Sequence, residues 1–165
     1  MPFYIASGGT ISGVMQWFTR EWRDGALSDE EWQQRLDDYE LHTAALRPDL
    51  PLDQAWLLDL DLHDGQVQSW RESDGQFSWV LLTGDLERGY RLTSLHYLDA
   101  HLIGADTEDL DELLLGSRSE LLYDEVSQVG DILEHRFLFD PSGEFGVRFR
   151  RASVSYAPAD STMRR

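Results

Sequence analysis

Within residues 57–63 the chain alternates strictly between apolar and polar side chains from residue 58 onward. The apolar set is Leu58, Leu60 and Leu62, and the polar set is Asp59, Asp61 and His63. A period of two predicts a strand with one face in a core and the other in water. Asp64 and Gly65 accept positive φ, so they predict a turn directly after this strand.

Three further strands are predicted after that turn, over residues 66–72, 76–83 and 90–98. The intervals between them are short, which favours an antiparallel meander. Residues 76–83 are apolar at odd and even positions alike, so this strand should lie centrally in the sheet. The chain is expected to stay extended as far as Ile103 and to break at Gly104.

The N-terminal part of the chain, residues 15–47, has a helical pattern. Trp17, Phe18 and Trp22 cluster on one helix face. A capping box over residues 28–31 begins a second helix, which the prolines at 48 and 51 end. We interpret the aromatic residues as core, and the alternative is an aromatic floor for a ligand.

Residues 106–116 predict a short acidic helix. Carboxylates in its first turn complement the helix dipole, and a glycine follows its last turn. Strands are predicted after it over residues 121–126, 132–139 and 145–150. Short turns separate these strands, so they should form a pair of hairpins.

The register of the second hairpin follows from its loop. Placing Asp140 opposite Glu144 leaves a three-residue loop with Gly143 in the left-handed position. The resulting pairs are Phe139 with Phe145, Phe137 with Val147, His135 with Phe149 and, on the opposite face, Glu134 with Arg150. One face is then apolar and the other carries a charge pair, as a half-buried sheet requires.

These elements predict an α+β fold: N-terminal helices packed on an antiparallel β-sheet of meander and hairpin strands, with one inserted acidic helix. A single domain is expected over residues 15–156. A loose N-terminal arm over residues 1–14 precedes it, and a disordered tail over residues 157–165 follows. A chain of 165 residues can bury roughly two thirds of its unfolded surface, so the domain should fold alone.

The charge of the chain restricts its partners. Thirty-one acidic residues against fourteen basic ones give a net charge of −17, which repels nucleic-acid phosphates and anionic lipid and favours a basic partner. The alternative is that the acidity only aids solubility. There is no cysteine, which excludes thiolate zinc sites. No apolar run approaches the ~20 residues that cross a bilayer, so we predict a soluble, cytoplasmic protein.

The sharpest candidate for chemistry is the stretch from Asp59 to Asp64. On a strand, Asp59, Asp61 and His63 would share one face, where carboxylates and an imidazole could bind a cation. The calcium-loop template fails, because His63 and Asp64 stand where it needs Asp or Asn and then Gly. We therefore assign no metal to this stretch.

Histidines elsewhere are weak candidates for the same site. His96 and His101 differ in parity, so they point to opposite faces of a regular strand. His135 shares a face with Phe137 and Phe149, where a hydrogen-bonded structural histidine is the commoner outcome.

Signatures of catalysis are missing from the sequence. It contains no Gly-x-Ser-x-Gly elbow, no His-Glu-x-x-His and no Gly-x-Gly-x-x-Gly. Asp124 and Glu125 beside Tyr123 could supply a general acid or base. Adjacent positions on a strand face opposite ways, which weakens any mechanism that needs paired carboxylates. We assign no catalytic residue and no cofactor, and the sequence leans towards a protein that is not an enzyme.

Several short motifs together resemble the DUF4085 family, which comprises small bacterial proteins of unknown function. The motifs are Met15 to Trp22, the acidic helix after it, Leu62 to Gly65 at a strand end, and Leu121 to Glu125 before the closing hairpin. The resemblance spans most of residues 15–156 and implies no activity. The closing strands are also similar to sheets of bacterial toxin-immunity proteins, which is an analogy of fold.

Two functions are therefore expected as alternatives. The first is a non-catalytic domain that binds a basic protein on an acidic surface, in an immunity-like arrangement. The second is a small enzyme or a metal- or ligand-binding domain with a carboxylate and histidine pocket near His63. The candidate binding residues are Asp59, Asp61, His63, Asp64, Asp109, Asp111 and Glu112.

Overall fold

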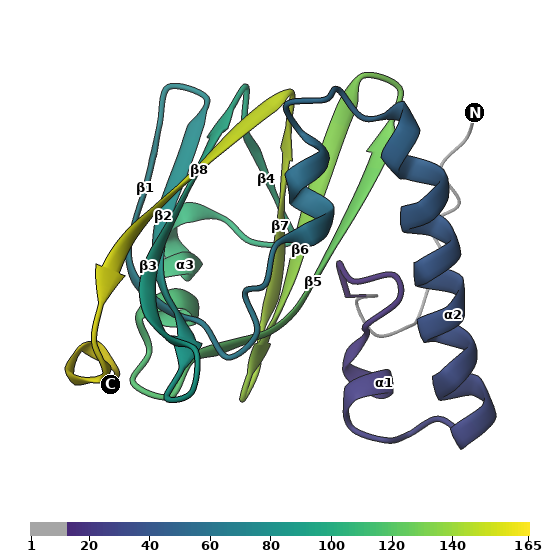
Figure 1. Ribbon diagram of the computed structural model, residues 1–165, viewed down its shortest axis with the longest axis horizontal. Helices are drawn as coiled ribbons and strands as arrows, with labels where there is room; N and C mark the ends of the chain where they lie inside the picture. Colours follow the sequence, from purple (N-terminus) through teal and green to yellow (C-terminus); the bar gives the residue numbers. More distant parts are fainter. Residues whose placement is uncertain (1–12) are drawn as a thin grey trace.

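Figure 1 shows the computed structural model of the chain, in which the structure describes residues 13–165. The helices are α1 (Arg20–Arg23), α2 (Asp29–Leu46) and α3 (Thr107–Leu115), with 3₁₀-helices η1 (Arg47–Asp49), η2 (Ala55–Asp59) and η3 (Ser161–Met163). The strands are β1 (Gln66–Ser73), β2 (Gln76–Asp85), β3 (Gly89–Leu98), β4 (His101–Ile103), β5 (Glu120–Val129), β6 (Ile132–Asp140), β7 (Glu144–Phe149) and β8 (Arg151–Ala159). This content confirms the predicted α+β class.

The strands form two antiparallel sheets where the sequence predicted one. Their strand orders are β1-β2-β3-β8 and β4-β7-β6-β5. The chain changes sheets between β3 and β4, at Asp99 with a φ of +53° and at Ala100, whose N–H donates to the Gly75 carbonyl. The two sheets pack face to face into a sandwich (Figure 1).

Aromatic side chains fill the space between the sheets. The ring of Trp79 lies edge-on to Phe137, with centroids 4.7 Å apart, and to Phe145, at 5.5 Å. Tyr97 meets Phe149 in the same way at 4.9 Å. Each such ring removes about 150–250 Å² from water, so this layer is the main source of stability in the sandwich.

A second, smaller apolar cluster holds residues 13–46, which we call the N-terminal layer, against the outer face of β5 and β6. Met15, Phe18 and Trp22 pack on Leu138 of β6, apart from the sandwich core. In Figure 1, α2 lies at the end of the molecule farthest from β1 and β2. The N-terminal helices therefore cover one face of one sheet.

The meander and the helix ends are as predicted. β2 lies between β1 and β3, and α3 follows an Asp106 cap and ends before Gly116. At the start of α2 the Ser28 side chain accepts from the Glu31 N–H, and the Glu31 carboxylate accepts from the Ser28 N–H. These are local signals, set by a few neighbouring residues.

The prediction of a strand over residues 57–63 is wrong. Residues 55–59 form η2, and residues 60–62 belong to no strand. The alternation fits a different arrangement, in which Leu57 and Leu62 are buried and Asp59 turns outward to pair with Arg47. The turn predicted at its end is confirmed, with a φ of +59° at Asp64.

The second hairpin has the predicted strands in a register shifted by two residues. The observed pairs are Phe137 with Phe145, His135 with Val147, Leu133 with Phe149 and Glu134 with Arg148. Inside the loop the N–H of Phe139 donates to the Gly143 carbonyl at 2.9 Å, so Phe139 does not pair with Phe145. An even shift leaves every side chain on its predicted face.

The C-terminal residues are ordered, where a disordered tail was expected. β8 continues to Ala159 beside β3. Arg165 donates its N–H to Gln66 and a guanidinium N–H to the Val67 carbonyl, both at 2.8 Å, so the end of the chain lies along β1. Of the predicted N-terminal arm, residues 1–12 lie outside the described residues.

The buried side chain of Gln54 substitutes for a neighbouring strand at the free edge of β8. It accepts the Ala152 N–H at 2.7 Å and donates to the Ala152 carbonyl at 3.1 Å. Gln54→Ala should lower the free energy of unfolding by about 2 kcal/mol, because both backbone groups lose their partner. Leu52→Ala, at a side chain that is 98% exposed, is the control. Urea denaturation measures both, and an unchanged midpoint for Gln54→Ala would contradict the role.

Candidate functional site

The residues that the sequence singled out lie in three separate places. Asp59 on η2 binds Arg47 at 2.6 Å, and this hydrogen-bonded guanidinium lowers the pKa of the Asp59 carboxyl. Three of the others lie beside the β2–β3 hairpin, namely Asp61, His63 and Asp64. The remaining three, Asp109, Asp111 and Glu112, are on α3. Within residues 13–165, no three histidine or acidic side chains are arranged to hold a metal ion.

A polar cleft of about 340 Å³, which we call the histidine cleft, lies beside His63. Its lining residues are Asp61, His63, Asp64, Thr83, Gly84, Asp85, Arg88, Gly89 and Arg91. The Nδ1 atom of His63 is 2.6 Å from the Leu122 carbonyl oxygen. A carbonyl only accepts, so Nδ1 carries a proton and the orientation of the ring is fixed.

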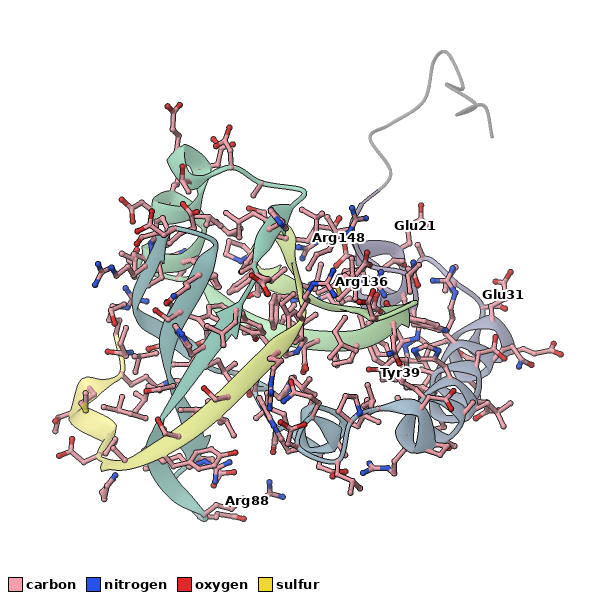
Figure 2. The ribbon with its side chains drawn as sticks, turned by 90° about the horizontal axis from the view of Figure 1, so that it is seen from above. Glu21, Glu31, Tyr39, Arg88, Arg136 and Arg148 are labelled. Atoms are coloured by element: carbon pink, nitrogen blue, oxygen red, sulfur yellow. The ribbon has the colours of Figure 1, made fainter. Side chains whose placement is uncertain are left out.

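Both signs of charge meet in the histidine cleft. Arg88, at the edge of the molecule in Figure 2, lies 3.4 Å from Asp61. Arg91 is held over the ring of Tyr156, 4.1 Å from its centroid. The Asp85 carboxylate accepts the Arg88 and Glu87 N–H groups of its own turn, which lowers its pKa. Such a cleft suits a small polar ligand that carries both charges.

A larger groove of about 500 Å³, which we call the α3 groove, lies between α3 and the loop from β6 to β7. Asp109 and Glu112 line it, whereas Asp111 does not and accepts the Trp70 indole N–H at 2.7 Å. The nearby carboxylates, that of Asp106 first, raise the pKa of Asp109. The groove therefore presents crowded negative charge beside a loop.

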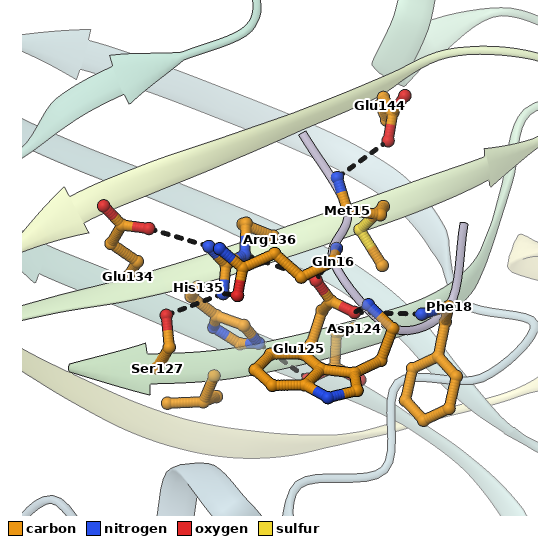
Figure 3. Close-up of polar contacts among 12 residues, drawn as sticks. Met15, Gln16, Phe18, Asp124, Glu125, Ser127, Glu134, His135, Arg136 and Glu144 are labelled. Atoms are coloured by element: carbon orange, nitrogen blue, oxygen red, sulfur yellow. Dashed lines mark hydrogen bonds and ion pairs between the residues drawn. The ribbon is translucent and has the colours of Figure 1, made fainter. Parts of the chain in front are cut away.

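The outer face of β5 and β6 contains a buried cluster of charges (Figure 3). Glu125 and Arg136 pair across the two strands and are almost completely buried. The Nε atom of Arg136 is 3.3 Å from Glu125, and its Nη1 donates to Glu134 at 2.8 Å. Glu134 also accepts from Arg148 at 2.6 Å. These pairs offset the cost of removing the charges from water.

Glu125 has a second role, because its carboxylate also binds the N-terminal layer. It accepts three successive backbone N–H groups, from Gln16 at 2.5 Å, Trp17 at 2.9 Å and Phe18 at 3.0 Å. Close by, the Met15 N–H donates to Glu144 at 3.0 Å (Figure 3). The N–H groups of residues 16–18 thus form an anion-binding turn, and the carboxylate of Glu125 occupies it.

On the inner face of the same sheet, His135 links Tyr97 to Asp124. The Tyr97 hydroxyl is 2.9 Å from Nδ1, and an Asp124 oxygen is 2.7 Å from Nε2. A carboxylate only accepts, so Nε2 carries a proton and donates to Asp124. Burial raises the pKa of Tyr97 well above its usual range. His135 is therefore the hydrogen-bonded core histidine that the sequence predicted.

The remaining sequence candidates do not add to a site. His96 and His101 line neither the histidine cleft nor the α3 groove. Asp124 and Glu125 point to opposite faces of β5, as neighbours on a strand should.

The sequence does carry a signal for the buried charges. In the predicted hairpin a turn at residues 130–131 brings Glu125 opposite Arg136, between strands that are otherwise largely apolar. An acid and a base facing each other in such strands indicate a buried pair. The three N–H donors of the N-terminal layer have no comparable signal, because they are backbone groups.

Comparison of the chain with protein-family models, with curated proteins and with solved structures found no match. No helix within residues 13–165 has the length and apolarity to cross a membrane.

The buried Tyr97 hydroxyl gives stability a predictable dependence on alkaline pH. Its pKa is raised in the folded protein, so above about pH 10 the unfolded chain loses a proton that the folded chain keeps. The free energy of unfolding should therefore fall as the pH rises past 10, by about 1.4 kcal/mol per unit from this group. Tyr97→Phe should remove this contribution, whereas the contribution of Tyr39, whose pKa is also raised by burial, should remain.

Urea denaturation between pH 9 and 11.5 measures this slope for the wild type and for Tyr97→Phe. The chain has no lysine, so tyrosines dominate its titration in that range. Tyr156→Phe, at a half-exposed side chain, is the matched control. Equal slopes in the wild type and Tyr97→Phe would contradict the prediction.

Proposed function

We propose that the protein is a non-catalytic binding protein that holds a basic protein against its acidic surface, in an immunity-like arrangement. The α3 groove is the proposed contact site. A cytoplasmic location and a place in the DUF4085 family stay predictions, and neither supplies an activity.

One observation carries this proposal: the acidic stretch of α3 has no ion-pair partner among residues 13–165. Its members are Asp106, Glu108, Asp109, Asp111 and Glu112, and none is within 4.0 Å of a basic nitrogen. Crowded carboxylates raise one another's free energy, as the raised pKa of Asp109 indicates. A cation supplied by a partner relieves this repulsion.

The arginines of the chain are mostly engaged elsewhere. Eight of the fourteen pair with acids outside α3. Among the described residues that line the α3 groove, Arg118 is the one basic residue. Leu113 lies in the same lining. An acidic wall beside an apolar side chain fits a lysine or arginine of the partner, whose aliphatic stem needs apolar contact.

Two charge-matched double variants test the proposed contact site. Asp109→Asn with Glu112→Gln should weaken binding of the basic partner about tenfold or more, because two of the carboxylates that line the groove lose their charge. Asp37→Asn with Asp38→Asn removes the same net charge from exposed positions on α2 and should weaken binding less than threefold. Titration of the purified partner, first captured from the host lysate and released by salt, measures both. Equal losses would mean that only net charge matters.

Cross-linking locates the contact independently of affinity. A carbodiimide joins carboxylates to primary amines, and this chain has no lysine, so its links to the partner report the partner's lysines. Links at Asp109 or Glu112 are expected. Links confined to α2 or to the β2–β3 hairpin would contradict the proposed contact site.

A second candidate function, binding of a small ligand in the histidine cleft, is favoured by the fixed ring of His63 between Arg88 and Asp64. A ligand that carries both charges, such as a free amino acid, should raise the melting temperature of the wild type. The rise should be lost in His63→Gln and kept in His101→Gln, whose side chain lies outside the cleft. A screen of amino acids and inorganic phosphate with no rise in the wild type would count against this function.

A further inference from the structure

The N-terminal layer is built as a body separate from the sandwich. Its apolar contacts, centred on Phe18 and Trp22, form a cluster of their own. Most of α2 is exposed, and Leu46 at its C-terminal end is its one buried residue. The layer therefore shares little apolar surface with the core that stabilises the two sheets.

The parts of the layer are tied to one another. Arg35 of α2 donates to the carbonyl of Trp17 at 3.0 Å. The indole N–H of Trp22 donates to the Trp32 carbonyl at 3.2 Å, and the two rings stack with centroids 5.0 Å apart. Residues 15–23 and α2 should therefore move together.

The two ends of α2 are held differently. Leu46 and the nearby Leu50 belong to the sandwich core, so the C-terminal end of α2 is anchored. Nearer its middle, Tyr39 accepts the Val126 N–H at 3.1 Å and His42 bonds to the Val126 carbonyl at 2.8 Å. These two polar contacts occupy the free edge of β5 and can be replaced by water.

We propose that the N-terminal layer is a lid, which opens as a unit about its anchor at Leu46 and Leu50 while the sandwich stays folded. Glu125 is the latch, because its carboxylate holds three successive N–H groups of the lid. Opening exposes the face of β5 and β6 that carries Glu125, Arg136 and Leu138. This inference does not rest on the proposed binding function.

The structure offers a matched pair of variants to test the latch. Glu125 and Glu134 are both buried and both pair with Arg136. Only Glu125 is bonded to the lid, so Glu125→Gln and Glu134→Gln remove the same charge from the same cluster with different consequences. Native-state hydrogen exchange of the full chain, read residue by residue, is the measurement.

Glu125→Gln should speed exchange of the α2 amides about tenfold or more and change the β6 and β7 amides less than threefold. Glu134→Gln should show no such preference for α2. Phe18→Leu loosens the lid through its apolar cluster and should give the same exchange pattern as Glu125→Gln. It replaces Glu125→Gln as the test variant if Glu125→Gln folds poorly. Exchange that speeds equally in α2 and β6, or that stays unchanged in α2, would overturn the proposal.

Discussion

The structure depends on one constraint: strand β6 is covered on both faces. Every residue of β6 from Leu133 to Phe139 is buried, the inner face by the sandwich and the outer face by the N-terminal layer. Polar groups on such a strand must find partners inside the protein. Tyr97 and Asp124 bond to His135 on one face. On the other face Arg136 donates to Glu134 and Ser127, and the Glu125 carboxylate balances its charge. Both buried networks follow from the layering.

Features that depend on neighbours in sequence were predictable. The Ser28 capping box, the acidic start of α3 and the positive φ of Asp64 depend on a few adjacent residues, and all are present. The predicted register of the second hairpin was wrong by two residues. The prediction relied only on which face of the sheet each side chain occupies, and an even shift leaves those faces unchanged. The alternation at residues 58–63 misled because η2 and the irregular residues after it bury Leu57 and Leu62 without forming a strand. Which strand joins which sheet depends on distant contacts that no local pattern carries.

The candidate sites were also predictable only as far as they depend on residues that are neighbours in sequence. The acidity of α3 could be read from the sequence, but the α3 groove also needs the loop between β6 and β7, some thirty residues further on. The prediction that Asp59 and His63 share one face was wrong, because it assumed a strand over residues 57–63. All arginine–acid pairs among residues 13–165 lie outside α3, so the unmatched charge of α3 is a property of the fold as much as of the composition.

Binding of a basic protein at the α3 groove is tested most directly by the hydrogen-exchange footprint of the protein in complex with its purified partner. We expect slowed exchange in α3 and in the loop from β6 to β7, with the histidine cleft unchanged. Slowed exchange confined to residues 61–64 and 83–91, with α3 unchanged, would contradict it and favour the histidine cleft as the functional site.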